Sequence, residues 1–204
     1  MILNIKKPIL DEDGFYQGIN KAIQENRHVD YLKNVIEDYE AYKKAFVAVF
    51  TEENPDDFVY RFRITYLNKK AVWREILILG NQTFENLATT IITTMGWNND
   101  HLHGFSLPQK HQSKNYPSSI PYTFFADGWE DDPHPTYKSY QIYICVINYT
   151  LCPKLEFEFD FGDSHIFTVE FKEMRKSIKG ESKKILPKLI DQRGIAPEQY
   201  PKYD

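Results

Sequence analysis

The segment from Phe58 to Phe105 constrains the fold more than any other part of the chain, because a strand, a second strand, a helix and a third strand follow one another there. In the first strand, large apolar side chains occupy every second position: Phe58, Tyr60, Phe62, Ile64 and Tyr66. A period of two is typical of a strand with one buried face. A second apolar run at 72–79 follows a short polar link, so the two runs predict a β-hairpin.

An amphipathic helix is predicted over residues 83–95. Its apolar side chains recur at three- and four-residue spacing, which is typical of a helix that lies on a sheet: Phe84, Leu87, Ala88, Ile91, Ile92 and Met95. The hydroxyl of Thr83 can cap the first turn. Gly96 follows the last turn, where glycine tolerates the left-handed backbone conformation that ends many helices. Trp97 is expected to enter the core.

Further strands are predicted beyond this segment. Residues 101–107 alternate so that His101 and His103 share one strand face, and residues 122–125 predict a short strand. Residues 139–149 carry apolar side chains on both faces. Such a pattern is typical of a strand in the middle of a sheet.

A second hairpin is predicted around the turn Gly162-Asp163-Ser164, because apolar residues alternate with polar ones over 155–161 and again over 166–171. The basic tail contains an apolar run at 185–190, which predicts one short helix. Together these elements predict an α+β fold. It consists of a mixed, mainly antiparallel sheet, begun by strand, strand, helix and strand, with the helix packed on one face.

The first 56 residues predict a separate helical extension. Apolar residues recur at helical spacing over 15–23 and over 31–49, and a polar, proline-containing linker follows at 54–57. A chain of 204 residues can bury one substantial core. The predicted organisation is therefore an N-terminal helical extension at 1–56 and an α+β domain at 57–204.

Charge and cysteine content limit the partners and the compartment. A net charge of -4 gives the whole chain no electrostatic reason to bind nucleic acid. Two cysteines, Cys145 and Cys152, are too few for a disulfide framework, so a reducing compartment is expected. Neither a signal-peptide pattern nor an apolar run long enough to span a membrane is found, which predicts a cytoplasmic protein without a membrane partner.

Four ordered motifs carry a family resemblance: Trp73-Arg74, Met95-Gly96-Trp97, the run from His101 to Phe105, and Asp160-Phe161-Gly162-Asp163. They resemble the plasmid pRiA4b ORF-3-like family, which is carried on plasmids and as a passenger in transposable elements. The resemblance covers about residues 58–200, and residues 196–201 are similar to the way such domains end. It implies an α+β fold and an association with mobile elements, and supplies no activity, since the family is functionally uncharacterised.

The chain departs from that family after the turn at Gly162. The family shows a tryptophan and, two residues later, a histidine, whereas this chain has His165 and Phe167. A role that depends on the tryptophan and histidine pair is therefore not carried over.

A metal or acid/base site is the main enzymatic hypothesis. His101 and His103 are expected on one strand face, with Asp160, Asp163 and His165 near the second hairpin. Imidazole and carboxylate ligands suit zinc, manganese or iron, so His101, His103 and Asp163 are candidate ligands of a divalent metal. Such a site would make the protein a metal-dependent hydrolase or nuclease. Alternatively, the histidines line a sheet surface and Asp163 stabilises a turn.

A non-enzymatic interaction module without a cofactor is the main prediction, with Trp73 and Arg74 as further candidate surface residues. Cys145 lies inside an apolar run, and a glycine-rich phosphate loop is missing from the sequence. An aromatic fraction of 15%, with 14 tyrosines, predicts a tyrosine-lined sheet face that could meet a protein partner.

Single-stranded nucleic acid is the third alternative. Arg61, Arg63 and Arg74 lie near the first hairpin, residues 172–184 are basic, and interleaved aromatic side chains could stack on bases. The acidic total charge opposes this alternative.

Overall fold

The computed structural model describes residues 12–27, 29, 32, 36, 43–44, 47–107, 122–125 and 137–200. The elements in chain order are α1 (Glu12–Gln24), β1 (Phe58–Tyr66), the 3-10 turn η1 (Leu67–Lys69), β2 (Trp73–Leu79), α3 (Phe84–Thr94), β3 (His103–Leu107), β4 (Tyr122–Phe125), β5 (Tyr137–Lys138), the 3-10 turns η2 (Ser139–Gln141) and η3 (Ile144–Val146), β6 (Lys154–Phe159), β7 (His165–Lys176) and β8 (Lys188–Arg193).

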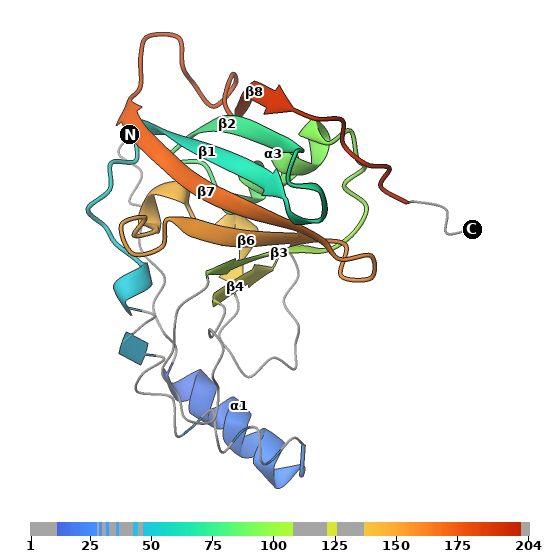
Figure 1. Cartoon of the computed structure of the whole chain (residues 1–204). Coiled ribbons are helices and arrows are strands. Elements are labelled where there is room, and N and C mark those ends of the chain that lie inside the picture. The colour runs from blue at the N-terminus through green and yellow to red at the C-terminus, as the bar shows by residue number, and fades with distance from the viewer. Residues whose placement is uncertain are drawn as a thin grey trace.

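The strands form one eight-stranded sheet in the order β5-β4-β3-β6-β7-β1-β2-β8 (Figure 1). All neighbours are antiparallel except β4 and β5, which run parallel. Both predicted hairpins, β1 with β2 and β6 with β7, are present. The predicted α+β fold with a mixed, mainly antiparallel sheet is confirmed.

The predicted helix is α3, which lies on one face of the sheet (Figure 1). Thr83 caps it: the Thr83 hydroxyl accepts from the Asn86 backbone, and the Asn86 side chain accepts from the Thr83 backbone. Gly96 adopts a φ of 76°, as expected of the residue that ends the helix. The α3 side chains predicted to face the sheet are buried together with alternate residues of β1 and β2: Phe84, Leu87, Ala88, Ile91, Ile92, Tyr60, Phe62, Ile64, Ile76 and Ile78.

The prediction of a central strand over 139–149 is wrong. This segment forms the turns η2 and η3 with only single bridges, Thr83 to Tyr143 and Phe50 to Ile147. It is apolar on both sides because it packs into the core between α3 and the segment before β1. Its backbone groups form hydrogen bonds with other segments instead of pairing along a strand. For example, Cys145 N–H donates to Gly80 O at 3.0 Å and Asn148 N–H donates to Val49 O at 2.7 Å.

The prediction of a short helix over 185–190 is also wrong, because β8 begins at Lys188 and pairs with β2. The edge of β2 offers unpaired backbone groups, and pairing satisfies them. Pro187 opposes a helix as well, since a proline disfavours helical backbone angles at the residue before it.

The tyrosines of β1 do not line an exposed sheet face. Tyr60 and Tyr66 are buried, and so is Tyr149. The Tyr60 hydroxyl donates a hydrogen bond to Pro55 O at 2.9 Å. Because this bond satisfies the hydroxyl, the phenol can be buried. The burial of Tyr60 and Tyr66 agrees with their predicted place on the apolar face of β1, and the tyrosine-lined surface stays a prediction for other tyrosines.

In the N-terminal extension, α1 confirms a helix over the first apolar run, with Phe15 and Ile19 buried. The second helix predicted over 31–49 lies largely outside the described residues. Close to the domain, Thr51 N–H donates to Val146 O at 2.8 Å and the Asn54 side chain donates to Ile147 O at 2.7 Å. The boundary after residue 56 stays a prediction. No helix in the described ranges has the length and apolar content needed to cross a membrane.

We expect Gly80→Ala to destabilise the fold. A Cβ at this position would lie 2.8 Å from both Pro55 O and the Tyr60 ring, and a backbone carbonyl has little room to move. Overpacking of this kind costs about 1–3 kcal/mol, measurable by urea unfolding. Gly18→Ala on α1 is the matched control, since nothing lies within 4 Å of its added Cβ and alanine favours a helix. Equal unfolding midpoints for wild type and Gly80→Ala would contradict the expectation.

Candidate functional site

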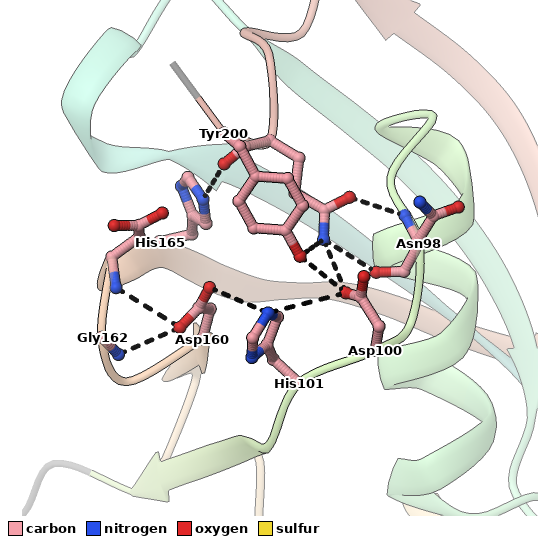
Figure 2. A network of polar contacts seen from close by, with 9 residues as sticks. Asn98, Asp100, His101, Asp160, Gly162, His165 and Tyr200 are labelled. Atoms are coloured by element: carbon pink, nitrogen blue, oxygen red, sulfur yellow. Dashed lines mark hydrogen bonds and ion pairs between the residues drawn. The ribbon is translucent and has the colours of Figure 1, made fainter. Parts of the chain in front are cut away.

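Residues of three of the four family-like motifs, and of the C-terminal segment, converge at one end of the sheet, although they are far apart in the sequence (Figure 2). Four segments meet there: the end of α3 with the residues that follow it, the approach to β3, the turn between β6 and β7, and the C-terminal segment. We call the polar residues at this junction the junction cluster: Asn98, Asp100, His101, Asp160, His165, Gln199 and Tyr200.

Gln199 connects the C-terminal segment to the residues after α3. Its side-chain oxygen accepts from the Asn98 N–H at 2.7 Å, and its amide nitrogen donates to Asn98 O at 3.0 Å. The same nitrogen lies 2.9 Å from an oxygen of Asp100. A side-chain amide thus satisfies both backbone groups of one loop residue, as a neighbouring strand would.

Tyr200 completes this side of the cluster by donating its hydroxyl to Asp100 at 2.8 Å. The hydrogen bonds from Tyr200 and Gln199 hold the pKa of Asp100 below its ordinary value. Partial desolvation and the bond to Asp100 raise the pKa of Tyr200 to about 12. A phenol with such a pKa stays protonated at neutral pH, so Tyr200 acts here as a hydrogen-bond donor and is poorly suited to be a base.

The two carboxylate oxygens of Asp160 contact different groups. One oxygen accepts from the backbone N–H groups of Gly162 at 3.0 Å and Asp163 at 3.3 Å, which holds the turn between β6 and β7. The other oxygen lies 3.6 Å from Nε2 of His101. Asp160 is buried and has a φ of 58°, whereas the His101 side chain is 44% exposed. The arrangement is a fixed carboxylate beside an accessible imidazole.

His165 is a buried histidine at the start of β7. Its Nε2 lies 3.0 Å from Gln199 O and its Nδ1 lies 3.2 Å from the Tyr66 hydroxyl. Because a carbonyl oxygen only accepts, Nε2 carries a proton. The ring packs on Trp97 with centroids 4.4 Å apart, and the Trp97 indole donates to Pro197 O at 2.9 Å. Trp97 is buried as predicted, and both rings hold the C-terminal segment on the sheet.

His103 lies in a different environment from His101. β3 begins at His103, so His101 is outside the strand and the expected two-histidine strand face does not form. His103 is 2% exposed, and its Nε2 lies 3.2 Å from a Glu85 carboxylate oxygen on α3 without the alignment of a hydrogen bond. The two histidines therefore contact different carboxylates.

The predicted metal ligands are not brought together. Across the described ranges, no group of three or more His, Cys, Asp or Glu side chains could hold a metal ion. His101 meets Asp160 and His103 meets Glu85, while the exposed Asp163 contributes its backbone N–H to Asp160. The arrangement is pairwise, and a metal held by protein ligands alone needs at least three of them.

Arg74 has a structural role. It is buried, donates from Nε to Thr94 O at 3.0 Å and from Nη1 to Arg193 O at 3.0 Å, and so joins the end of α3 to the end of β8. Burial lowers the pKa of its guanidinium, and the carbonyls at a helix C-terminus favour a cation. Trp73 is half-buried and carries the Arg63 guanidinium over its ring at 4.3 Å.

The other arginines of the nucleic-acid alternative are also engaged. Arg63 donates to Glu75 at 2.7 and 2.9 Å, and Arg61 lies 3.6 Å from Glu75 and 3.2 Å from Glu173. Each positive charge is balanced within the sheet. The arginine face proposed for single-stranded nucleic acid is therefore neutralised by the chain itself.

Four residues of the junction cluster were missed by sequence reasoning: Asn98, Asp100, Gln199 and Tyr200. The only signal for Gln199 and Tyr200 is the resemblance of residues 196–201 to the end of the family. Nothing in local spacing brings Asn98 and Asp100 to these two residues, because the contact spans about a hundred residues of sequence.

We expect Gln199→Ala to destabilise the protein by about 1–3 kcal/mol, because it leaves the Asn98 N–H and carbonyl without partners. Urea unfolding measures the loss, and hydrogen exchange at the Asn98 amide reports it locally. Gln192→Ala on β8 is the control, since that side chain is exposed and should change stability by less than about 0.5 kcal/mol. If the two variants unfold at the same urea concentration, Gln199 does not hold the junction.

Comparisons with known proteins give a family match and a similar fold. A search of curated proteins found no match. A crystal structure of a protein of unknown function, MM3350 from Methanosarcina mazei Go1, shares the fold with a TM-score of 0.56 and 20% identity, over 70% of this chain and 73% of that one. Residues 58–200 match the family described as plasmid pRiA4b ORF-3-like protein. Because this match covers most of its length, the chain belongs to the plasmid pRiA4b ORF-3-like family.

Proposed function

We propose that this protein is a non-enzymatic interaction module that binds its partner through the connection between β7 and β8. We call residues 176–188 the basic loop. In Figure 1 it projects beyond the end of the sheet. The observation that carries the proposal is a set of five exposed lysines, none of which has a carboxylate within ion-pair distance in the described part of the chain: Lys176, Lys179, Lys183, Lys184 and Lys188.

The basic loop is held in one conformation. The Glu181 carboxylate accepts two hydrogen bonds from the Arg175 guanidinium, at 2.6 and 2.9 Å, and a third from the Ile178 N–H at 2.9 Å. At the base of the loop, Leu186 is buried with residues of β1 and β2, and Gln82 donates to Leu186 O at 2.6 Å. A loop that is ordered before binding loses less conformational entropy on binding, which favours association.

Two isoleucines project from the same loop. The exposed fraction of Ile178 is 64% and that of Ile185 is 54%. Single exposed apolar residues are common on protein surfaces. Two of them among five unneutralised lysines, on an ordered projection, form a surface with an apolar and a cationic component.

Strand addition at β8 is a less suitable mode of binding. The pairing of β8 with β2 shifts register between Glu75 and Ile76, and the Gln192 N–H donates to the Asp191 side chain at 2.8 Å. A register shift and a blocked donor protect an edge strand from pairing with another chain. The basic loop therefore supports the proposal better than the sheet edge does.

A hydrolase is the second candidate, favoured by the exposed imidazole of His101 beside the fixed carboxylate of Asp160. We test it with the purified protein by elemental analysis and by hydrolysis of activated ester and phosphodiester substrates. A stoichiometric transition metal, or hydrolysis that His101→Ala abolishes and His111→Ala preserves, would overturn the non-enzymatic proposal. The association with mobile elements and the cytoplasmic location stay predictions.

The proposed function predicts that capture of a partner depends on the basic loop. Tagged wild type and the variant Lys183→Gln/Lys184→Gln are used to capture nucleic acid and protein from cells, and both classes are quantified with and without nuclease. We expect the variant to lose at least one captured species that wild type retains. The matched control is Lys69→Gln/Lys70→Gln, an adjacent exposed lysine pair beside the first hairpin. Identical capture by all three proteins would contradict the proposal.

The order of the basic loop should depend on pH. Two contacts from Arg175 and the bond from Ile178 lower the pKa of Glu181 from 4.5 to about 2. Because a lowered carboxyl pKa stabilises the charged form in the folded loop, this contribution is present above about pH 4.5 and is lost as the pH falls toward 2. The protection factor of the Ile178 amide, which compares its exchange rate with the intrinsic rate at the same pH, should therefore fall over this range in wild type. In Glu181→Gln the protection factor should already be low at pH 6, and a high protection factor in that variant would contradict the assignment.

A further inference from the structure

We propose that the partner of the basic loop is duplex nucleic acid, bound through its phosphates with the loop inserted into a groove. This inference rests on the proposed function and names the class of partner. Five lysines and one glutamate give residues 176–188 a net charge of +4, so the rest of the chain carries -8. A polyanion is repelled by most of the molecule and attracted to this one projection.

The chemistry of the loop fits phosphate better than it fits bases. Residues 176–188 contain neither arginine nor an aromatic residue. Base stacking and two-point recognition of guanine are therefore unavailable to the loop itself. Lysine ammonium groups bind phosphates as point charges without reading sequence, and their binding energy comes largely from the release of condensed counterions.

The single glutamate of the loop does not weaken this charge. Glu181 is occupied by Arg175, which lies immediately before the loop. The pair is neutral and leaves all five lysines free to meet phosphates. By contrast, Lys172 is paired with Glu170 at 2.6 Å, and Arg61 and Arg63 are paired with carboxylates of the sheet. The projection therefore carries a group of five lysines without ion pairs in the described part of the chain.

The exposed isoleucines favour a groove over a flat contact. Proteins that enter the minor groove frequently insert an apolar side chain, isoleucine included, between base steps, and they also use lysines or arginines in the groove. Ile178 stands between Lys176 and Lys179, and its backbone is fixed by Glu181. A rigid loop with an apolar side chain between cations matches that arrangement. It does not match the single-strand mode, which needs aromatic side chains for stacking.

The test measures binding of the purified, nucleic-acid-free chain to a labelled DNA duplex of about two helical turns, by fluorescence anisotropy between 50 and 200 mM salt. Each lysine that meets a phosphate contributes about -0.9 to the slope of log K against log salt. Five contacts predict that wild-type affinity falls about 500-fold over this range. For Lys183→Gln/Lys184→Gln the expected fall is about 40-fold, and for Lys69→Gln/Lys70→Gln it is the same as for wild type.

The variant Ile178→Ser tests insertion into the groove separately from phosphate binding. We expect this variant to bind the duplex about tenfold more weakly, because it loses apolar contact, with an unchanged salt slope. Circular dichroism checks that each variant is folded. Equal salt slopes for wild type and Lys183→Gln/Lys184→Gln would overturn the phosphate contact. Equal affinity for the single strand and the duplex would overturn the groove.

Two further probes distinguish failure of this inference from failure of the proposed function. Polyglutamate stands for an acidic protein, and phosphatidylserine vesicles stand for an anionic membrane. Binding to either that depends on Lys183 and Lys184, without such binding to the duplex, overturns the nucleic-acid inference and leaves the interaction module standing. If the variant binds all three probes like wild type and captures the same species from cells, both proposals fail.

Discussion

The burial of α3 against the sheet is the interaction on which the other parts of the structure depend. Each of its fully buried Phe, Leu and Ile side chains contributes about 1.5–3 kcal/mol, whereas the cap at Thr83 contributes about 1 kcal/mol. Packing therefore decides that the helix forms, and the cap decides where it begins. Once α3 lies across β1 and β2, its C-terminus comes close to the start of β2. There the Arg74 guanidinium joins it to β8.

The position of α3 also brings the remaining motifs together. Gly96 turns the chain so that Trp97 enters the core, and Trp97 then holds Pro197 and packs on His165. Most of the junction cluster consequently bonds to other parts of the same chain. A polar residue in a family-like motif is often taken as a sign of chemistry. Here the main contacts of Gln199 and His165 join segments that are distant in sequence, and the Asp160 side chain accepts hydrogen bonds within its own turn. Both kinds of contact contribute to stability.

Positive charge differs between the sheet and the basic loop. The arginines of β1 are paired with carboxylates, whereas the lysines of the basic loop are not paired within the described residues. The arginines of β1 are partnered by Glu75, which is buried, and by Glu173, which is exposed. Their effect is to remove positive charge from the sheet face. The basic loop keeps its lysines unneutralised while its one carboxylate is occupied by Arg175. This difference, invisible in the total charge of -4, is the basis of the interaction proposed for this protein.

The sequence by itself determined the two hairpins, α3 with its cap and its terminating glycine, and the burial of Trp97, because each depends on the spacing of neighbouring residues. It failed for 139–149 and for 185–190, where an apolar run is compatible with more than one backbone conformation and the choice depends on which edge or layer lies beside it. It also placed His101 and His103 together, although β3 begins only at the second of them. Only the tertiary structure decided that Gln199 meets Asn98 and that Glu75 neutralises the arginines of β1, since contacts between distant segments depend on how the whole chain packs.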